Sequence, residues 1–217
     1  MRISKRIREI EKLIPEGSIV ADIGCDHAYL STLAVLHGKA IKCYACDIAQ
    51  GPLENAKKTI RDMNCEDRVF PVLSNGLEKV PQDADVCVIS GMGFETLKAI
   101  LEDRDLSQFK SFILQINGDV YDLRKWIIAH DMKITDERII HEGHFYAILV
   151  VQHGHDDYSE EDYIFGKYLQ GSVFKEYWQF RKQKIQEILQ NIHDQKQMDE
   201  LAQLLKMIQR KGAVTNK

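Results

Sequence analysis

The sequence predicts an α/β protein with a doubly wound parallel sheet, followed by a separate helical section. Between residues 18 and 151, short runs of β-branched and other apolar residues alternate with stretches of helical periodicity. This alternation is typical of βαβ units, which build a parallel sheet with helices on both faces. From about residue 162 onward the pattern is helical only. We therefore expect two parts, residues 1–161 and residues 162–217.

The first predicted element is an amphipathic helix at residues 4–13. Its apolar side chains lie three and four positions apart, Ser4 is a candidate N-cap, and its other face carries Lys5, Arg6, Arg8 and Lys12. An apolar run that ends in a glycine turn predicts a strand at residues 18–23. A helix at residues 29–36 is followed by a strand at residues 42–47 and by a helix at residues 52–63 that begins with proline.

The second half of the sheet follows the same logic. Apolar runs predict strands at residues 68–73, 86–89 and 111–116, and the first two end in glycine-containing turns. Helices are expected at residues 94–102 and 120–129. Two further runs, residues 133–141 and 145–151, are joined by Glu142-Gly143-His144 and predict a hairpin that adds an antiparallel edge strand.

The C-terminal section carries apolar residues that alternate spacings of four and three. A polar break at residues 191–197 separates two such stretches, which predicts an antiparallel helical hairpin, coiled-coil-like in its spacing. Each stretch is short, so we favour pairing within one chain and expect a monomer. The predicted seam consists of Phe174, Trp178, Arg181, Ile185, Ile188, Ile192, Met198, Leu201, Leu205 and Ile208.

Composition narrows the class of protein. Hydrophobic residues make up 44% and charged residues 29% of the 217 residues, which is ordinary globular usage. The sequence has no apolar run long enough to span a membrane and no secretory signal pattern, so we expect a cytoplasmic protein. The five cysteines are expected to be buried and reduced. Cys43 and Cys46 have CxxC spacing, but no second pair completes a zinc site, and the histidines do not share metal-ligand spacing on one element.

Chemistry is expected at the carboxyl ends of the parallel strands, where open α/β sheets bind ligands. The first turn contains Asp22 and a single glycine, Gly24, so the dinucleotide fingerprint is not met, and Asp26 would repel a pyrophosphate. Asp47, at the end of the second strand, can accept hydrogen bonds from two ribose hydroxyls. Ribose recognition without phosphate recognition points to S-adenosylmethionine, with Asp22 near its ammonium end. The alternative is that Asp22 bonds only to backbone, Asp47 is a helix N-cap and Gly24 is a turn glycine.

Five segments resemble the bacterial tRNA (adenine-22-N1)-methyltransferase family, and the resemblance covers nearly the whole chain. They are ADIGCDHAYLSTLAVL, CDI, NGLE, SGMG and LQIN. The resemblance implies a class I Rossmann-like methyltransferase fold with a helical appendage, S-adenosyl-L-methionine as methyl donor, and methylation of an adenine N1 in the D-arm region of tRNA. It places the methionine part of the cofactor at the turn from Asp22 to Tyr29, with Gly24. The rest of the implied cofactor site comprises Asp47 and Ile48 (ribose), Asn75 and Gly76 (adenine), and Gly91 and Met92 (methyl-transfer pocket).

The sequence departs from the family pattern at four positions. Asp47 stands where many relatives have Glu, Asn75 where Asp is frequent, Phe94 where a second glycine follows GMG, and Ile116 where LQPN has proline. These departures concern substrate detail more than the class of reaction.

Candidate catalytic residues are Asp26, His27 and Tyr29. The methylated base becomes cationic, so a carboxylate near it stabilises the developing charge. We assign that role to Asp26, with His27 and Tyr29 orienting or stacking on the base. The alternative is that Asp26 and His27 cap the following helix and Tyr29 packs in the core.

The formal charge of −4 is an average over unlike parts. Residues 1–14 carry 5 basic and 2 acidic side chains, residues 15–162 carry 14 and 26, and residues 163–217 carry 10 and 5. Two basic ends are compatible with an RNA partner. Two other functions stay open: a methyltransferase of the same fold acting on another RNA or a small molecule, and a non-catalytic RNA- or partner-binding protein with a vestigial cofactor pocket.

Overall fold

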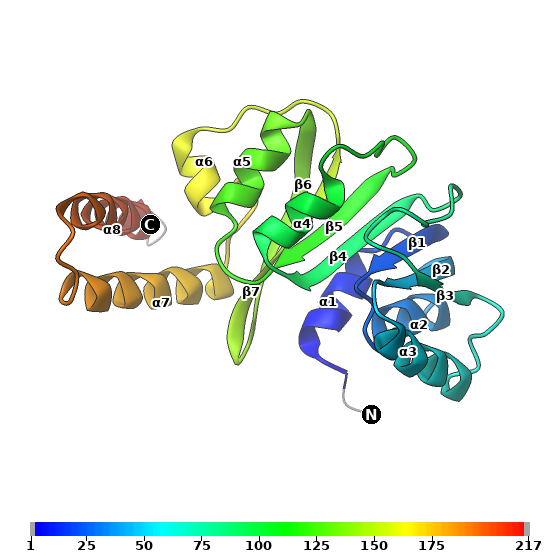
Figure 1. The fold of residues 1–217 in the computed structure, drawn as a ribbon. Helices are drawn as coiled ribbons and strands as arrows, with labels where there is room; N and C mark the ends of the chain where they lie inside the picture. The colour runs from blue at the N-terminus through cyan, green and yellow to red at the C-terminus, as the bar shows by residue number, and fades with distance from the viewer. Residues whose placement is uncertain (1–2, 215–217) are drawn as a thin grey trace. The chain divides into compact units, whose positions relative to one another are not determined.

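A seven-stranded sheet organises residues 18–153 in the computed structural model, which describes the backbone of residues 3–214 and the side chains of residues 3–211 (Figure 1). The strand order is β3-β2-β1-β4-β5-β7-β6. The first five pair in parallel, and β7 is antiparallel to both β5 and β6. The strands are β1 Ser18–Ile23, β2 Ala40–Asp47, β3 Val69–Leu73, β4 Val86–Met92, β5 Ser111–Ile116, β6 Met132–Glu142 and β7 His144–His153.

Helices cover both faces of the sheet and bury two separate apolar clusters. One face is packed by α1, α2 and α3, which contribute Ile10, Ala34 and Ile60 among others. The other is packed by α4 and α5, which contribute Leu97 and Leu123. The bounds are α1 Lys5–Leu13, α2 Tyr29–Leu36, α3 Gln50–Asp62, α4 Phe94–Leu101 and α5 Tyr121–Ala129.

The predicted α/β sheet is confirmed, and the differences lie at the ends of elements. Helix α3 begins at Gln50 and not at Pro52. Pro52 fits within the first turn because the N–H groups of that turn have no partner within the helix, so the missing N–H of proline costs no hydrogen bond. Strand β4 continues to Met92 through a register shift after Ser90. The strand antiparallel to the others is β7, and it lies between β5 and β6 and not at an edge. The edge strand on this side of the sheet is β6.

The chain divides into two compact units, of which the first ends at Tyr168 and the second begins at Leu169. The boundary predicted from the sequence, between residues 161 and 162, falls inside helix α6 (Glu160–Phe165). Helix α6 belongs to the first unit, since Phe165 is buried and Arg124 of α5 donates hydrogen bonds to the carbonyls of Tyr163 and Ile164.

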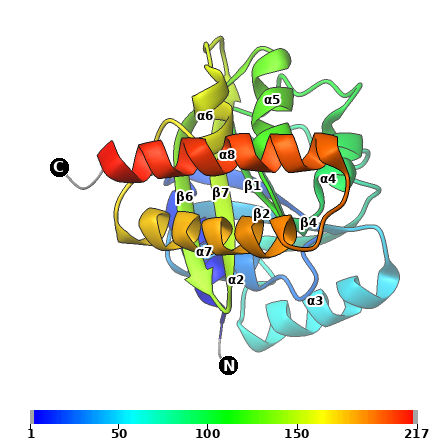
Figure 2. The same ribbon diagram turned by 90° about the vertical axis from the view of Figure 1, so that its left-hand side faces the viewer.

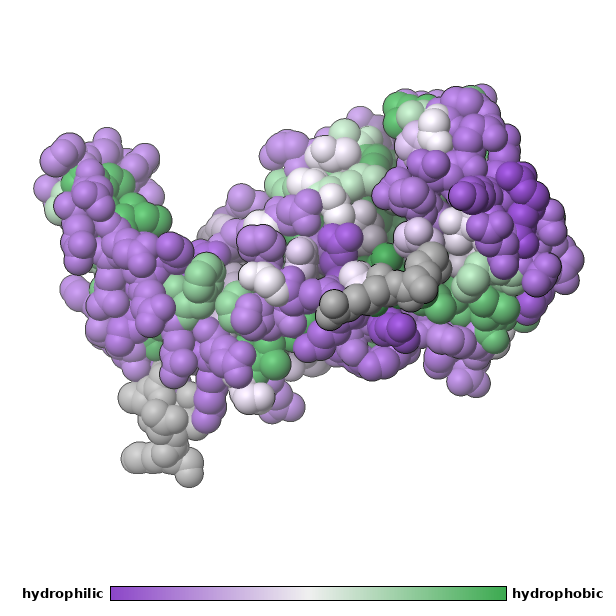
Figure 3. Space-filling view, turned by 90° about the horizontal axis from the view of Figure 1, so that it is seen from below, coloured by the Kyte–Doolittle hydropathy of each residue, from purple (hydrophilic) through white to green (hydrophobic). Residues whose placement is uncertain are grey.

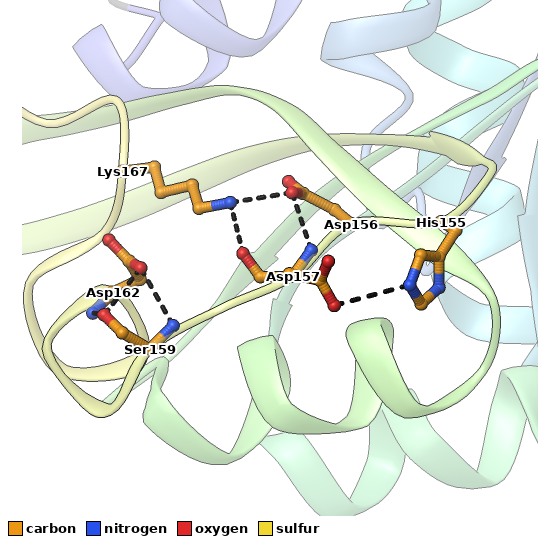
Figure 4. A network of polar contacts seen from close by, with 6 residues as sticks. All are labelled: His155, Asp156, Asp157, Ser159, Asp162 and Lys167. Atoms are coloured by element: carbon orange, nitrogen blue, oxygen red, sulfur yellow. Dashed lines mark hydrogen bonds and ion pairs between the residues drawn. The ribbon is translucent and has the colours of Figure 1, made fainter.

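A polar network fixes the segment between β7 and α6 (Figure 4). The Lys167 ammonium donates to the Asp156 carboxylate and to the Asp157 carbonyl, and it lies 4.4 Å from the centre of the Tyr158 ring. Ser159 and Asp162 form a reciprocal capping box that begins α6. This loop is therefore held by its own side chains.

The second unit consists of α7 (Ser172–Leu189) and α8 (Gln195–Val214), which run antiparallel side by side (Figure 2). Of the predicted seam, Phe174, Trp178, Ile185 and Ile208 are buried. Ile188 is 46% exposed, because α7 ends one residue later and the chain turns away. Arg2 and Lys217, which belong to the basic ends counted from the sequence, lie outside the described residues.

All five cysteines are buried and unpaired, and burial raises the pKa of each thiol. Within the described residues, no three His, Cys, Asp or Glu side chains are grouped so that they could hold a metal ion. No helix in residues 3–214 is both long and apolar enough to cross a membrane.

A buried ion pair joins α5 to β6. Arg124 and Glu137 have side chains that are 2% and 1% exposed, and Arg124 Nε lies 2.7 Å from Glu137 Oε1. Burial raises the pKa of the Glu137 carboxyl, and the guanidinium opposes that shift. Gly166 passes so close to this pair that a Cβ at that position would collide with the Glu137 carboxylate. The pair therefore fixes both α6 and the chain that leaves it.

Replacing Arg124 with Met leaves the Glu137 carboxylate buried without its cation. We expect the free energy of unfolding, measured by urea denaturation at pH 7, to fall by about 3–5 kcal/mol. The control is Lys125→Met, an exposed neighbour, which should change it by less than about 0.5 kcal/mol. The double variant Arg124→Met with Glu137→Leu should regain much of the loss. An Arg124→Met protein as stable as Lys125→Met contradicts this account.

Candidate functional site

The candidate site lies where the order of the strands reverses, between β1 and β4. Strands β2 and β3 extend to one side of this point and β5 to the other. Because β1 to β5 are parallel, the turns that follow them meet at a single edge of the sheet. The topology therefore gathers the predicted residues of four separate segments at one edge.

Asp22, the penultimate residue of β1, holds the start of α2. Asp22 is 4% exposed, and its carboxylate accepts a hydrogen bond of 2.7 Å from the Ser31 hydroxyl. The Ser31 backbone N–H also donates to it. Ala28, the N-cap residue of α2, offers no side-chain cap, so Asp22 supplies one from the neighbouring strand. Burial raises the pKa of Asp22 from 3.8 to about 6; Ser31 lowers it and Asp47 adds to the rise.

The turn after β1 is built from left-handed residues. Gly24 has a φ of 75°, and a Cβ on it would collide with the end of the Met92 side chain. Asp26 and Ala28 also have positive φ, at 46° and 53°. Such backbone is strained for residues other than glycine and persists where the surroundings enforce it. The backbone of this turn packs around Asp22 and Met92, and it adopts strained conformations at Asp26 and Ala28 as a result.

The three candidate catalytic residues occupy this turn. Asp26 is exposed, and its carboxylate lies 3.8 Å from His27 Nε2. The rings of His27 and Tyr29 are stacked, with centres 5.3 Å apart and planes 10° apart. Neither Asp26 nor His27 caps α2, and Tyr29 is only half-buried. The alternative in which they serve the helix and the core does not match this arrangement.

Asp47 ends β2 and is followed by an exposed apolar residue. Its Oδ1 accepts the Ala49 N–H at 2.9 Å, while the N-cap residue of α3 is Ala49 and not Asp47. Ile48 is 69% exposed. Leu73 of β3, which pairs with Asp47 of β2, is 45% exposed. A carboxylate flanked by exposed aliphatic side chains suits a ligand with both hydroxyl groups and a flat apolar ring.

Asn75 and Gly76 lie in the turn after β3. Asn75 is exposed and donates to the Glu78 carboxylate at 3.0 Å. Gly76 has a φ of 56°, and a Cβ there would press against Ile100 of α4 at 3.2 Å. Ser74 connects this turn to β2, because its backbone N–H donates to the Asp47 carbonyl at 2.9 Å.

Gly91 and Met92 end β4 and are held by two residues that the sequence analysis did not assign. The Gly91 N–H donates to Gln115 Oε1 at 3.0 Å, and its carbonyl accepts from Asn117 Nδ2 at 2.8 Å. The Asn117 N–H donates to the Met92 carbonyl at 2.7 Å. Gln115 is fully buried in the otherwise apolar strand β5. In the sequence, a glutamine among the aliphatic residues of a strand was the signal by which Gln115 could have been predicted.

The two departures near the pocket lie in ordinary packing positions. Phe94, the first residue of α4, is half-buried against the core cluster of that face. Ile116 is 1% exposed and pairs with Met92 across the sheet.

Comparison with known proteins identifies the relatives of this chain. A family model described as tRNA (adenine(22)-N(1))-methyltransferase matches residues 20–213. The Bacillus subtilis (strain 168) protein named tRNA (adenine(22)-N(1))-methyltransferase is 31% identical over 219 residues, which cover 95% of this chain and 92% of that protein.

Two solved structures extend the similarity to the fold. Mycoplasma (M. capricolum) TrmK, in complex with the cofactor product S-adenosyl-homocysteine, superposes with a TM-score of 0.87 at 29% identity, covering 97% of this chain and 98% of that chain. Streptococcus pneumoniae Sp1610, in complex with S-adenosyl-L-methionine, gives a TM-score of 0.88 at 30% identity, with 96% and 99% covered. The resemblance inferred from the motifs is thereby confirmed, and the chain belongs to the tRNA (adenine(22)-N(1))-methyltransferase family.

Proposed function

We propose that this chain transfers the methyl group of S-adenosylmethionine to N1 of adenine 22 in tRNA. The observation that carries the proposal is that a chain of this family brings the Asp22–Gly24 turn, Asp47 and the Gly91–Met92 turn to one edge of its sheet. The same edge would serve a methyltransferase acting on another RNA, and the substrate test below separates the two.

The residues at this edge fit the chemistry of the cofactor. The desolvated carboxylate of Asp22 suits a cationic partner, which would be the ammonium of the methionine part. Asp47 would accept hydrogen bonds from the ribose hydroxyls, with Oδ2 as the oxygen not bonded to Ala49. Ile48 and Leu73 would cover the adenine ring, beside the Asn75–Gly76 turn. Gly91 and Met92 would border the reacting methyl group.

The reaction requires positioning more than acid–base chemistry. When bound, S-adenosylmethionine supplies a methyl group on a positively charged sulfur. Adenine N1 already has the lone pair that forms the new bond, so the protein must align and desolvate the base. Because N1 lies on the Watson–Crick edge, the adenine must be unpaired to be reached. The His27–Tyr29 stack offers a ring surface for that base, and the exposed Asp26 carboxylate would stabilise its positive charge.

We further expect the protein to act as a monomer in the cytoplasm, where tRNA is found. The basic residues of the helical unit, including Lys175, Lys182 and Lys184, would contact the tRNA backbone. The charge of residues 163–217, with 10 basic and 5 acidic side chains, supports this contact.

The substrate assignment is tested with two tRNA transcripts that differ only at position 22. We expect N1-methyladenosine in the A22 transcript after incubation with the protein and S-adenosylmethionine, and none in the G22 transcript, because the base to be methylated is absent. The readout is mass spectrometry of the nucleosides. Methylation of both transcripts, or N6-methyladenosine in place of the N1 product, contradicts the proposal.

The role of Asp26 is tested by Asp26→Asn. Asparagine tolerates the left-handed backbone, so the turn should be retained while the charge is lost. We expect kcat for tRNA methylation to fall by about 10- to 100-fold with an unchanged Kd for S-adenosylmethionine. Asp103→Asn is a matched control, since Asp103 is also exposed with a φ of 57° but lies in the loop after α4. A normal kcat in Asp26→Asn refutes the role.

A further inference from the structure

We propose that α1 and the β6–β7 turn form an RNA-binding rim beside the methyl-transfer pocket, and that Arg6 binds a backbone phosphate next to the target nucleotide. The rim comprises Lys5, Arg6, His141, His144, Phe145 and Tyr146. This inference rests on the proposed function, because it assigns the rim to the same RNA substrate.

The strand pairing brings the β6–β7 turn to the edge that carries the site. Strand β5 ends at Ile116, which pairs with Met92 on one side and with Ala147 on the other. Because β7 is antiparallel to β5, residues 141–146 extend beyond the carboxyl end of β5. In Figure 1 the turn and the start of α1 lie at the same lower side of the view.

Arg6 is the cationic side chain that reaches the pocket from this rim. Its guanidinium carbon lies 5.2 Å from the centre of the Tyr146 ring. Arg6 Nη1 lies 3.6 Å from the place where a Cβ on Gly91 would stand. The side chain is half-buried, and stacking on Tyr146 orients its planar fork. A guanidinium held beside an exposed glycine of the methyl-transfer turn is suited to bind an anionic group of the substrate.

The helix that carries Arg6 is anchored to the turn and is not a loose basic arm. The Glu142 carboxylate accepts the backbone N–H groups of Lys5 and Arg6 at 2.8 and 3.1 Å, and Ser4 caps the Ile7 N–H. Ile10 is fully buried beneath the helix. The negative charge of Glu142 is thus engaged with the helix N-terminus, where it is stabilised. This leaves Arg6 positioned with little entropy to lose on binding.

The aromatic residues of the turn complete a surface suited to unpaired RNA. The rings of His141 and Phe145 are stacked, with centres 4.3 Å apart and planes 9° apart, and His144 packs edge-on against Tyr146. His141 and His144 are exposed, and Phe145 and Tyr146 are half-buried. Accessible rings next to cations are the usual means of binding single-stranded nucleotides. Figure 3, seen from this side, shows a face that is mostly hydrophilic with separate hydrophobic patches. The two cations of the rim, Lys5 and Arg6, belong to residues 1–14, which carry 5 basic and 2 acidic side chains, whereas residues 15–162 carry 14 and 26.

The test compares Arg6→Ala with Arg8→Ala in the full-length protein. Arg8 is an exposed arginine on the same helix, about 200° around its axis from Arg6, so both variants lose the same charge. We expect Arg6→Ala to raise the KM for tRNA about tenfold and to reduce the salt dependence of tRNA binding by about one counterion. Arg8→Ala should change the KM less than about twofold. The Kd for S-adenosylmethionine should match wild type in both variants.

Two further variants separate a phosphate contact from a structural role. Arg6→Lys keeps the charge but not the stacked fork, so it should regain part of the lost affinity and the full salt dependence. Tyr146→Leu should weaken tRNA binding partly through Arg6, so the double variant Arg6→Ala with Tyr146→Leu should lose less affinity than the sum of the two single losses.

Three results overturn the inference. They are an Arg6→Ala KM equal to that of Arg8→Ala, a loss of S-adenosylmethionine affinity in Arg6→Ala, and strictly additive effects of Arg6→Ala and Tyr146→Leu. All are measured against a wild-type protein that methylates the A22 transcript. An inactive wild-type protein would instead refute the proposed function, so the two failures are distinguishable.

Discussion

The hydrogen bonds from Ser31 to the buried Asp22 carboxylate fix the turn on which the site depends. They substitute for the missing cap of α2 and draw the start of that helix onto the end of β1. The strained residues Asp26 and Ala28 lie between the two anchored points. Backbone hydrogen bonds hold the same turn: the Gly24 and Cys25 N–H groups donate to the Cys46 carbonyl, and the Ala28 N–H donates to the Cys25 carbonyl. Together these contacts enforce left-handed backbone at two positions that are not glycine.

A desolvated carboxylate is an unfavourable feature of a folded protein unless something offsets it. An aspartate in an unfolded chain titrates near 4, whereas Asp22 titrates near 6 in the fold. Between these values the folded chain binds more protons than the unfolded chain, so this group's contribution to stability falls as pH rises from 4 to 6. A bound cation would reverse that loss, which makes Asp22 a candidate for ligand binding as well as a helix cap.

Hydrogen bonding also shapes the other side of the candidate site. Gln115 and Asn117 engage both backbone groups of Gly91, so β5 determines the path of the turn after β4. Arg6 approaches the same glycine from α1. The Gly91–Met92 turn is therefore positioned by segments before and after it in the chain.

The alternation of apolar runs and helical periods was enough to predict the sheet, because parallel strands buried on both faces carry continuous apolar sequence. The glycines and aspartates at strand ends were found for the same reason: topology sends them to one edge. Contacts that depend on tertiary placement were not predictable. The cap that Asp22 provides for α2, the attachment of α6 through Arg124 and the position of Arg6 beside Gly91 join residues with no local pattern in common. Ile188 was predicted in the seam between the two helices but is 46% exposed, because periodicity does not show where a helix pair ends.

The most direct test of this account is the pH dependence of S-adenosylmethionine binding, measured by calorimetry between pH 5 and 7. If the ammonium of the cofactor stabilises the Asp22 carboxylate, the pKa near 6 falls on binding, and affinity rises about tenfold from pH 5 to pH 7. Asp22→Asn should bind more weakly and with a flat profile over the same range. A flat profile in the wild-type protein, or an Asp22→Asn variant with wild-type affinity and the same rise, would contradict the account.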